Sequence, residues 1–121
     1  SYESMKASIK NLSRYEGRKI AVLGDMFELG EYGEELHQKV GIEVAKNNID
    51  ILICAGENSK QIIKTAEKEG MNKQNIYYVQ DKQQILDLLE NIITKDDIIL
   101  LKASNGMKFY EIAENLLNSA F

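Results

Sequence analysis

The sequence predicts an α/β domain of the three-layer, Rossmann-like type, with a mostly parallel sheet and helices on both of its faces. Four short apolar runs alternate with amphipathic stretches, which is the order of repeated βα units. The run at residues 51–55, ILICA, shows no polar alternation, as expected of a strand covered on both faces. A length of 121 residues with 44% hydrophobic content suits one core, so we expect residues 1–121 to form a single domain.

Apolar spacing and capping signals predict the individual elements. Asn58 with Gln61 and Asp81 with Gln84 have the spacing of capping-box pairs at helix starts. In order, we expect a helix over Met5, Ile9 and Leu12 ended by Gly17, a strand at 19–23, a helix at 33–48 with Leu36, Val40 and Val44 inside, a strand at 51–55, a helix from Asn58 to Gly70, a strand at 76–79, a helix after Asp81, a strand at 97–101 and a last helix with Phe109 and Ile112 inside. The alternation implies right-handed crossovers and a mostly parallel sheet, and for the strand order we expect 3-2-1-4, in which the first and last strands are neighbours.

Composition excludes several classes of function. A net charge of −4 and a pI near 5.1 argue against a nucleic-acid partner, which requires a basic face. The single cysteine, Cys54, lies in an apolar run and is expected to be a buried, inert thiol. No run approaches the roughly 20 apolar residues of a membrane span. We therefore expect a cytoplasmic protein with no membrane partner.

Two loops carry the candidate binding residues. Residues 101–112, LKASNGMKFYEI, run from the last strand through a glycine turn into a helix, where free backbone N–H groups and the macrodipole favour an anion. Lys102 and Lys108 add positive charge, and the Ser104 hydroxyl with amides near Gly106 could hold a carboxylate. The alternative is a simple strand-to-helix turn in which Ser104 is only a cap.

The loop after the first strand, LGDMFELGE at residues 23–31, combines glycine with acids. Gly24 permits a tight exit from the strand, and Asp25 and Glu28 are candidate contacts to an ammonium or to positive groups of a partner domain. The alternative is that Asp25 forms a turn or caps a helix. Because neighbouring parallel strands end at the same edge, both loops should line one ligand crevice.

Other kinds of site are not predicted. His37 is the only histidine, so neither a multi-histidine metal site nor a Ser-His-Asp arrangement is expected, and a hydrogen-bonded packing role is favoured. The chain has no GxxxxGK[ST] loop and no GxGxxG after the first strand, so it lacks the usual ATP cradle. We expect no catalytic residue, metal or cofactor in this domain, and no activity of the domain alone.

Three segments together resemble the C-terminal domain of the Mur ligases. They are YESMKASIKNL at residues 2–12, LGDMFELGE with His37 and the VG at 40–41 downstream, and LKASNGMKFYEI. The loop sequence is similar to that of the members that add D-Ala-D-Ala to UDP-MurNAc-tripeptide. The chain begins without methionine and inside the first of these segments, so we expect a domain excised from a three-domain enzyme.

The resemblance implies partners and residue roles. The partners would be an N-terminal domain that holds the UDP-sugar and a central domain that holds ATP and Mg²⁺. It also implies that a D-Ala-D-Ala site is formed by Lys102, Ser104, Asn105 and Gly106, and that Ser1, Tyr2 and Ser4 face the nucleotide. Relatives commonly have glycine at Ala103 and arginine at Asn105, and an arginine would grip a carboxylate better than an amide.

Two alternatives stay open from the sequence. The domain could serve another Mur-type ligase or a folylpolyglutamate-type amide ligase, with a different acceptor. It could also be a free-standing Rossmann-like binding module.

Overall fold

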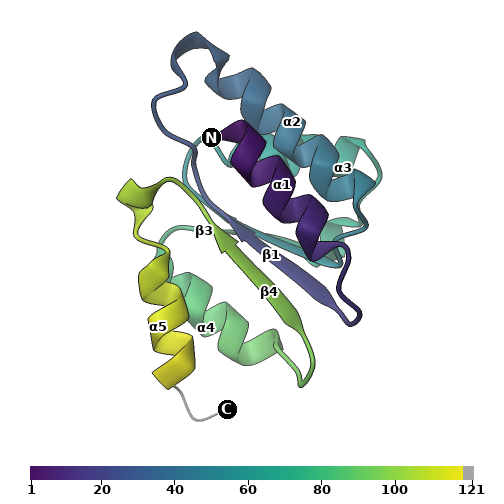
Figure 1. Cartoon of the computed structure of the whole chain (residues 1–121), viewed down its shortest axis with the longest axis vertical. Coiled ribbons are helices and arrows are strands. Elements are labelled where there is room, and N and C mark those ends of the chain that lie inside the picture. Colours follow the sequence, from purple (N-terminus) through teal and green to yellow (C-terminus); the bar gives the residue numbers. More distant parts are fainter. Residues whose placement is uncertain (119–121) are drawn as a thin grey trace.

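The computed structural model describes residues 1–118, which form one parallel sheet between two layers of helices (Figure 1). The elements in chain order are α1 (Tyr2–Leu12), β1 (Lys19–Leu23), a 3-10 turn (Gly30–Tyr32), α2 (Gly33–Lys46), β2 (Ile51–Ala55), α3 (Lys60–Lys68), a 3-10 turn (Lys73–Asn75), β3 (Ile76–Val79), α4 (Lys82–Ile92), β4 (Ile98–Lys102), a 3-10 turn (Asn105–Met107) and α5 (Tyr110–Asn118).

The sheet has the order β3-β2-β1-β4, and every pairing is parallel. The predicted fold class and strand order are therefore confirmed. Helices α1, α2 and α3 cover one face of the sheet, and α4 and α5 cover the other (Figure 1). Because β1 and β4 are neighbours in register, with Leu23 opposite Lys102, the loops that follow these two strands leave the same edge of the sheet.

The core is divided by the sheet into two apolar clusters. Along β1, Ala21 and Leu23 point toward α1–α3, whereas Ile20 and Val22 point toward α4 and α5, and all four are fully buried. Burial on both faces explains why residues 20–23 of β1 and all of β2 are apolar, whereas Lys19 stands at the half-buried start of β1. The face that carries α2 and α3 also depends on Gly41, where an added Cβ would lie 2.5 Å from the Ile62 carbonyl oxygen.

Three predicted boundaries are wrong. Helix α1 ends at Leu12 rather than at Gly17, which forms a later turn with φ +105°. The last strand begins at Ile98, because Asp97 instead accepts hydrogen bonds from Arg18 and Thr94. Helix α2 ends at Lys46, two residues early.

One predicted helix cap is wrong and the other is confirmed. Asn58 and Gln61 form no capping box, because α3 begins at Lys60 with Ser59 at the cap position. Asp81 does cap α4 by accepting the Gln84 N–H at 2.9 Å, although the Gln84 side chain accepts from Gln80. Gly70 follows the end of α3 with φ +106°, as its sequence position predicts. None of the described helices is both long and apolar enough to cross a membrane.

Candidate functional site

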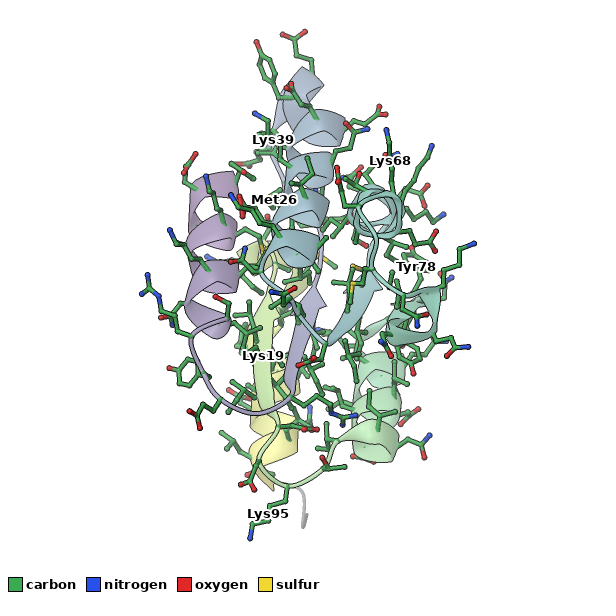
Figure 2. The ribbon with its side chains drawn as sticks, turned by 90° about the vertical axis from the view of Figure 1, so that its right-hand side faces the viewer. Lys19, Met26, Lys39, Lys68, Tyr78 and Lys95 are labelled. Carbon is green, nitrogen blue, oxygen red and sulfur yellow. The ribbon has the colours of Figure 1, made fainter. Side chains whose placement is uncertain are left out.

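The candidate site lies at the edge of the sheet where the parallel strands end. Figure 1 shows the loops after β1 and β4, and the first turn of α1, gathered at this end of the molecule. Lys39 lies at the same end in Figure 2, whereas Lys95 marks the opposite end. The structure therefore brings the predicted residues of both loops together at one edge.

Gly24 allows the loops after β1 and β4 to touch. Its N–H donates to the Lys102 carbonyl at 3.0 Å, which extends the ladder by one bond. A Cβ at this position would lie 2.8 Å from each of three atoms, on Ala103, Met107 and Phe109. Its φ is not positive, so the need for glycine comes from close packing rather than from a special turn conformation.

Three further hydrogen bonds hold the loops together. Ser104 N–H donates to the Asp25 carbonyl at 2.9 Å, and the Ser104 hydroxyl oxygen accepts the Phe27 N–H at 2.6 Å. The Asp25 N–H lies 3.0 Å from the Met107 sulfur. Ser104 makes no side-chain cap to the following turn, so the interpretation of Ser104 as a simple helix cap is wrong. Its hydroxyl proton stays available to donate to a ligand.

The residues after β4 form only a short turn, whereas the sequence predicted that they lead directly into a helix. Asn105–Met107 is a single 3-10 turn, Lys108 follows with φ 53°, and α5 begins only at Tyr110. A three-residue turn carries little macrodipole, so an anion here must be held by individual groups. Within residues 1–118, the exposed amides of Asn105 and Gly106 donate to no protein acceptor.

A hollow of about 260 Å³ lies between the end of β4 and the first turn of α5. It is lined by Leu101, Lys102, Ala103, Ser104, Asn105, Phe109, Tyr110 and Ala113. Among the described residues, neither Lys102 nor Lys108 forms an ion pair. A half-buried lysine, a serine hydroxyl and an asparagine amide thus border a concavity of suitable size for a small anionic group.

The two acids of the loop after β1 lie in different environments. Asp25 is 7% exposed, and its Oδ1 accepts the Ser59 N–H at 2.8 Å, so it anchors the loop after β1 to the start of α3. An added Cβ at Gly56 would collide with the same carboxylate. Glu28 is exposed with φ 62° and makes no hydrogen bond with the described residues. Asp25 is thus an anchor between loops, and a ligand role for either acid stays a proposal.

His37 is fully buried behind this loop and holds it to α2. Its Nε2 accepts the Met26 N–H at 3.0 Å, and its Nδ1 lies 2.6 Å from the Gly33 carbonyl oxygen. The packing role that the sequence favoured is therefore what the structure shows. Burial also raises the pKa of the Cys54 thiol far above its usual value, which agrees with an inert cysteine.

The N-terminal residues lie at the same end of the molecule. The Ser1 hydroxyl accepts the Ser4 N–H at 3.2 Å and so caps α1, and Lys39 lies 5.9 Å from the centre of the Tyr2 ring. Partial burial raises the pKa of Tyr2. No group of acidic, histidine or cysteine side chains among residues 1–118 has the arrangement of a metal site.

Four residues that shape this site are marked by no pattern in the sequence. Met26 presents its amide to His37, Phe27 donates to Ser104 and lies over Gly106, Met107 accepts from Asp25, and Tyr110 lines the hollow. Three of these act through backbone amides or a thioether, which no residue pattern marks. Figure 2 labels Met26 beside the ribbon of α2.

A Rossmann-like sheet with ligand-facing loops at its carboxyl edge is a fold shared by many binding domains. Comparison with known proteins identifies the family: residues 1–105 match the family described as Mur ligase, glutamate ligase domain. The chain belongs to the Mur ligase family.

Two curated relatives with the same name point to one kind of Mur ligase. The chain is 36% identical over 118 residues to UDP-N-acetylmuramoyl-tripeptide--D-alanyl-D-alanine ligase of Bacillus subtilis, covering 96% of this chain and 26% of that protein. It is 33% identical to the protein of the same name from Synechocystis, covering 95% of this chain and 25% of the relative. The chain thus spans about a quarter of the length of the curated relatives it matches.

Solved structures agree with this comparison. The MurF ligase of Thermotoga maritima, in complex with ADP, has a TM-score of 0.77 at 28% identity, covering 94% of this chain and 25% of that one. MurF from Acinetobacter baumannii has a TM-score of 0.84 at 22% identity, with 98% of this chain and 26% of that one covered, and supports the fold alone.

Proposed function

We propose that this chain is the C-terminal, acceptor-binding and closure domain of an ATP-dependent ligase that joins D-Ala-D-Ala to UDP-MurNAc-tripeptide in peptidoglycan precursor synthesis. The observation that carries the proposal is the hollow bordered by Lys102 and Ser104, in a chain whose curated relatives carry that ligase name. The remaining domains of the parent enzyme would hold the UDP-sugar, ATP and Mg²⁺. Because ATP and the nucleotide-linked precursor are cytoplasmic metabolites, the enzyme would work in the cytoplasm.

In this proposal the chain positions one reactant and excludes water. The dipeptide carboxylate would be held by Lys102, by the Ser104 hydroxyl proton and by the amides of Asn105 and Gly106. Its amine would then point toward the activated tripeptide carboxyl in the rest of the enzyme. Fixing the amine there and closing over it favours amide formation over hydrolysis.

Asn105 and the N-terminal segment have supporting roles in the same proposal. Asn105 would donate its amide to the carboxylate and so replace the arginine common in relatives with a weaker, neutral contact. Glu28, which is exposed in the loop after β1, would contact the dipeptide ammonium or a positive group of the adjoining domain. Ser1, Tyr2 and Ser4, at the same end, would face the nucleotide-binding domain.

Phosphate release by the full-length enzyme tests the proposal. With ATP and UDP-MurNAc-tripeptide present, release should depend on D-Ala-D-Ala, and Lys102→Ala should raise the dipeptide KM about tenfold with the ATP KM nearly unchanged, as expected for loss of one charge-assisted contact. Lys95→Ala, an exposed lysine at the opposite end, is the matched control. Equal effects of Lys102→Ala on both substrates would reject the assignment.

The acceptor assay also separates the other ligases. Release that depends on a single amino acid or on glutamate would reassign the enzyme to another Mur-type or folylpolyglutamate-type ligase. The 121-residue chain by itself should show no ATP hydrolysis, because it contains no phosphate loop. A purified chain that turned over ATP would contradict this.

A further inference from the structure

The first four backbone amides of the loop after β1 are occupied, each by a different partner. Gly24 donates to the Lys102 carbonyl, Asp25 to the Met107 sulfur, Met26 to His37 and Phe27 to the Ser104 hydroxyl. Three of these partners belong to β4 and the loop that follows it. Within residues 1–118, His37 is the only partner that ties these four amides to a helix on the other side of the loop.

The hydrogen bond from Met26 to His37 requires the histidine tautomer that carries its proton on Nδ1. Met26 is 3% exposed and His37 is fully buried, so an unpaired Met26 N–H would have no water to bond. Nε2 must present its lone pair to that N–H, which leaves the ring proton on Nδ1, where it donates to the Gly33 carbonyl. His37 therefore acts as a neutral bridge between the first turn of α2 and the loop.

We propose that His37 is a positioning residue for acceptor binding, which acts through Met26 and Phe27 on Ser104. The residue after Met26 donates its N–H to the Ser104 hydroxyl at 2.6 Å, and Ser104 in turn borders the hollow. Moving the Met26 amide displaces the Phe27 amide with it, because the two belong to consecutive peptide units that share the Met26 Cα. His37 itself contacts no substrate, and its role as a positioning residue rests on the function proposed above.

Two substitutions of similar size test the roles of the two ring nitrogens separately. In His37→Gln, the Gln oxygen reaches the position of Nε2 and accepts the Met26 N–H. In His37→Asn, the shorter amide reaches only the position of Nδ1 and keeps the bond to Gly33. We expect His37→Asn to raise the D-Ala-D-Ala KM of the full-length enzyme about tenfold with the ATP KM nearly unchanged, and His37→Gln to restore the wild-type value.

Hydrogen–deuterium exchange of the same enzymes tests the inference without any turnover. Exchange in residues 24–28 and 104–107 should be faster in His37→Asn than in wild type, and slow again in His37→Gln. Exchange around Asp97, at the far end of the sheet, should stay unchanged in all three proteins. If the Gln and Asn variants are alike in both measurements, or if only the amino end of α2 responds, the inference is wrong.

The two proposals fail separately. If phosphate release by the full-length enzyme does not depend on D-Ala-D-Ala, the proposed acceptor is wrong. The exchange data still decide whether His37 positions the loop. Conversely, a dipeptide-dependent enzyme in which His37→Asn leaves exchange of residues 104–107 and the dipeptide KM unchanged refutes the inference alone.

Discussion

The two ends of the sheet are stabilised by different kinds of contact. At the amino end, Arg18 donates to Asp97 at 2.7 and 3.1 Å and to the Ile92 carbonyl, and Thr94 completes the bonds of the carboxylate. At the carboxyl end, neutral backbone amides bond to side chains of distant segments, while Lys102 and Lys108 form no ion pair among the described residues.

This difference separates a structural end from the proposed binding end. At the amino end, the charges of Arg18 and Asp97 compensate each other. At the carboxyl end, neutral hydrogen bonds hold the loops, and Lys102 and Lys108 have no ion pair among the described residues, although the Glu111 carboxylate interacts with Lys108 at longer range. In the proposed function, an anionic substrate would be drawn to these lysines.

The largest effect is expected at Gly24, because it decides whether the two loops of the binding end can touch. Gly24→Ala would place a Cβ 2.8 Å from three side-chain atoms and should lower the free energy of unfolding by about 3 kcal/mol, the upper end of the usual overpacking cost. Gly33→Ala is the control, since its nearest neighbour is 4.0 Å away. Urea unfolding of both variants measures the difference in their free energies of unfolding. Equal midpoints would show that the two loops can move apart without loss of stability.

A smaller effect is expected at the amino end. Arg18→Ala should lower the free energy of unfolding near pH 7 by about 2 kcal/mol, because the Asp97 side chain, 4% exposed, loses its charged partner and keeps only Thr94. Acceptor and ATP KM values of the full-length enzyme should not change. An altered dipeptide KM would show that the two ends are coupled.

The pH dependence of this effect has a definite sign. The hydrogen bond from Arg18 lowers the pKa of Asp97, so the folded chain holds the ionised carboxylate more strongly than the unfolded chain does. The stabilisation is complete above the unfolded pKa of about 4 and is lost as the pH falls through the lower folded pKa. The difference between wild type and Arg18→Ala should therefore shrink below about pH 4 in unfolding experiments. A difference that grew with acid would contradict the ion-pair explanation.

The fold followed from the sequence because its signals are local or nearly so. The apolar runs at 19–23 and 51–55 and the cap at Asp81 each act within a few residues, and the expected strand order 3-2-1-4 is the observed one. The cap expected at Asn58 is wrong because α3 begins at Lys60, and the Ser59 N–H before it donates to Asp25, 34 residues earlier than Ser59 in the chain. A side chain that arrives from a neighbouring strand overrides a local preference.

The candidate site could be located from the sequence but not assembled. Strand adjacency and the lysine-serine-glycine pattern placed both loops at one edge, which the structure confirms. The contacts that shape the loops are made by the amides of Met26 and Phe27 and by the sulfur of Met107. Every residue except proline carries such an amide, so no sequence pattern predicts which ones find a side-chain partner.

The smallest of the three stability effects is expected at Asp25, whose two candidate roles can be separated. Asp25→Ala removes the shorter of the two bonds made by the Ser59 N–H, leaving the Gly56 carbonyl at 3.2 Å, and should lower the free energy of unfolding by about 1 kcal/mol, a typical net value for one hydrogen bond. Asp25→Asn keeps an oxygen in place and should unfold at nearly the wild-type urea concentration. If Asp25 is only an anchor, the Asn variant of the full-length enzyme also keeps the dipeptide KM. A raised dipeptide KM in a stable Asn variant would instead assign the negative charge of Asp25 to the dipeptide ammonium, and the binding end would then hold both charges of the zwitterion.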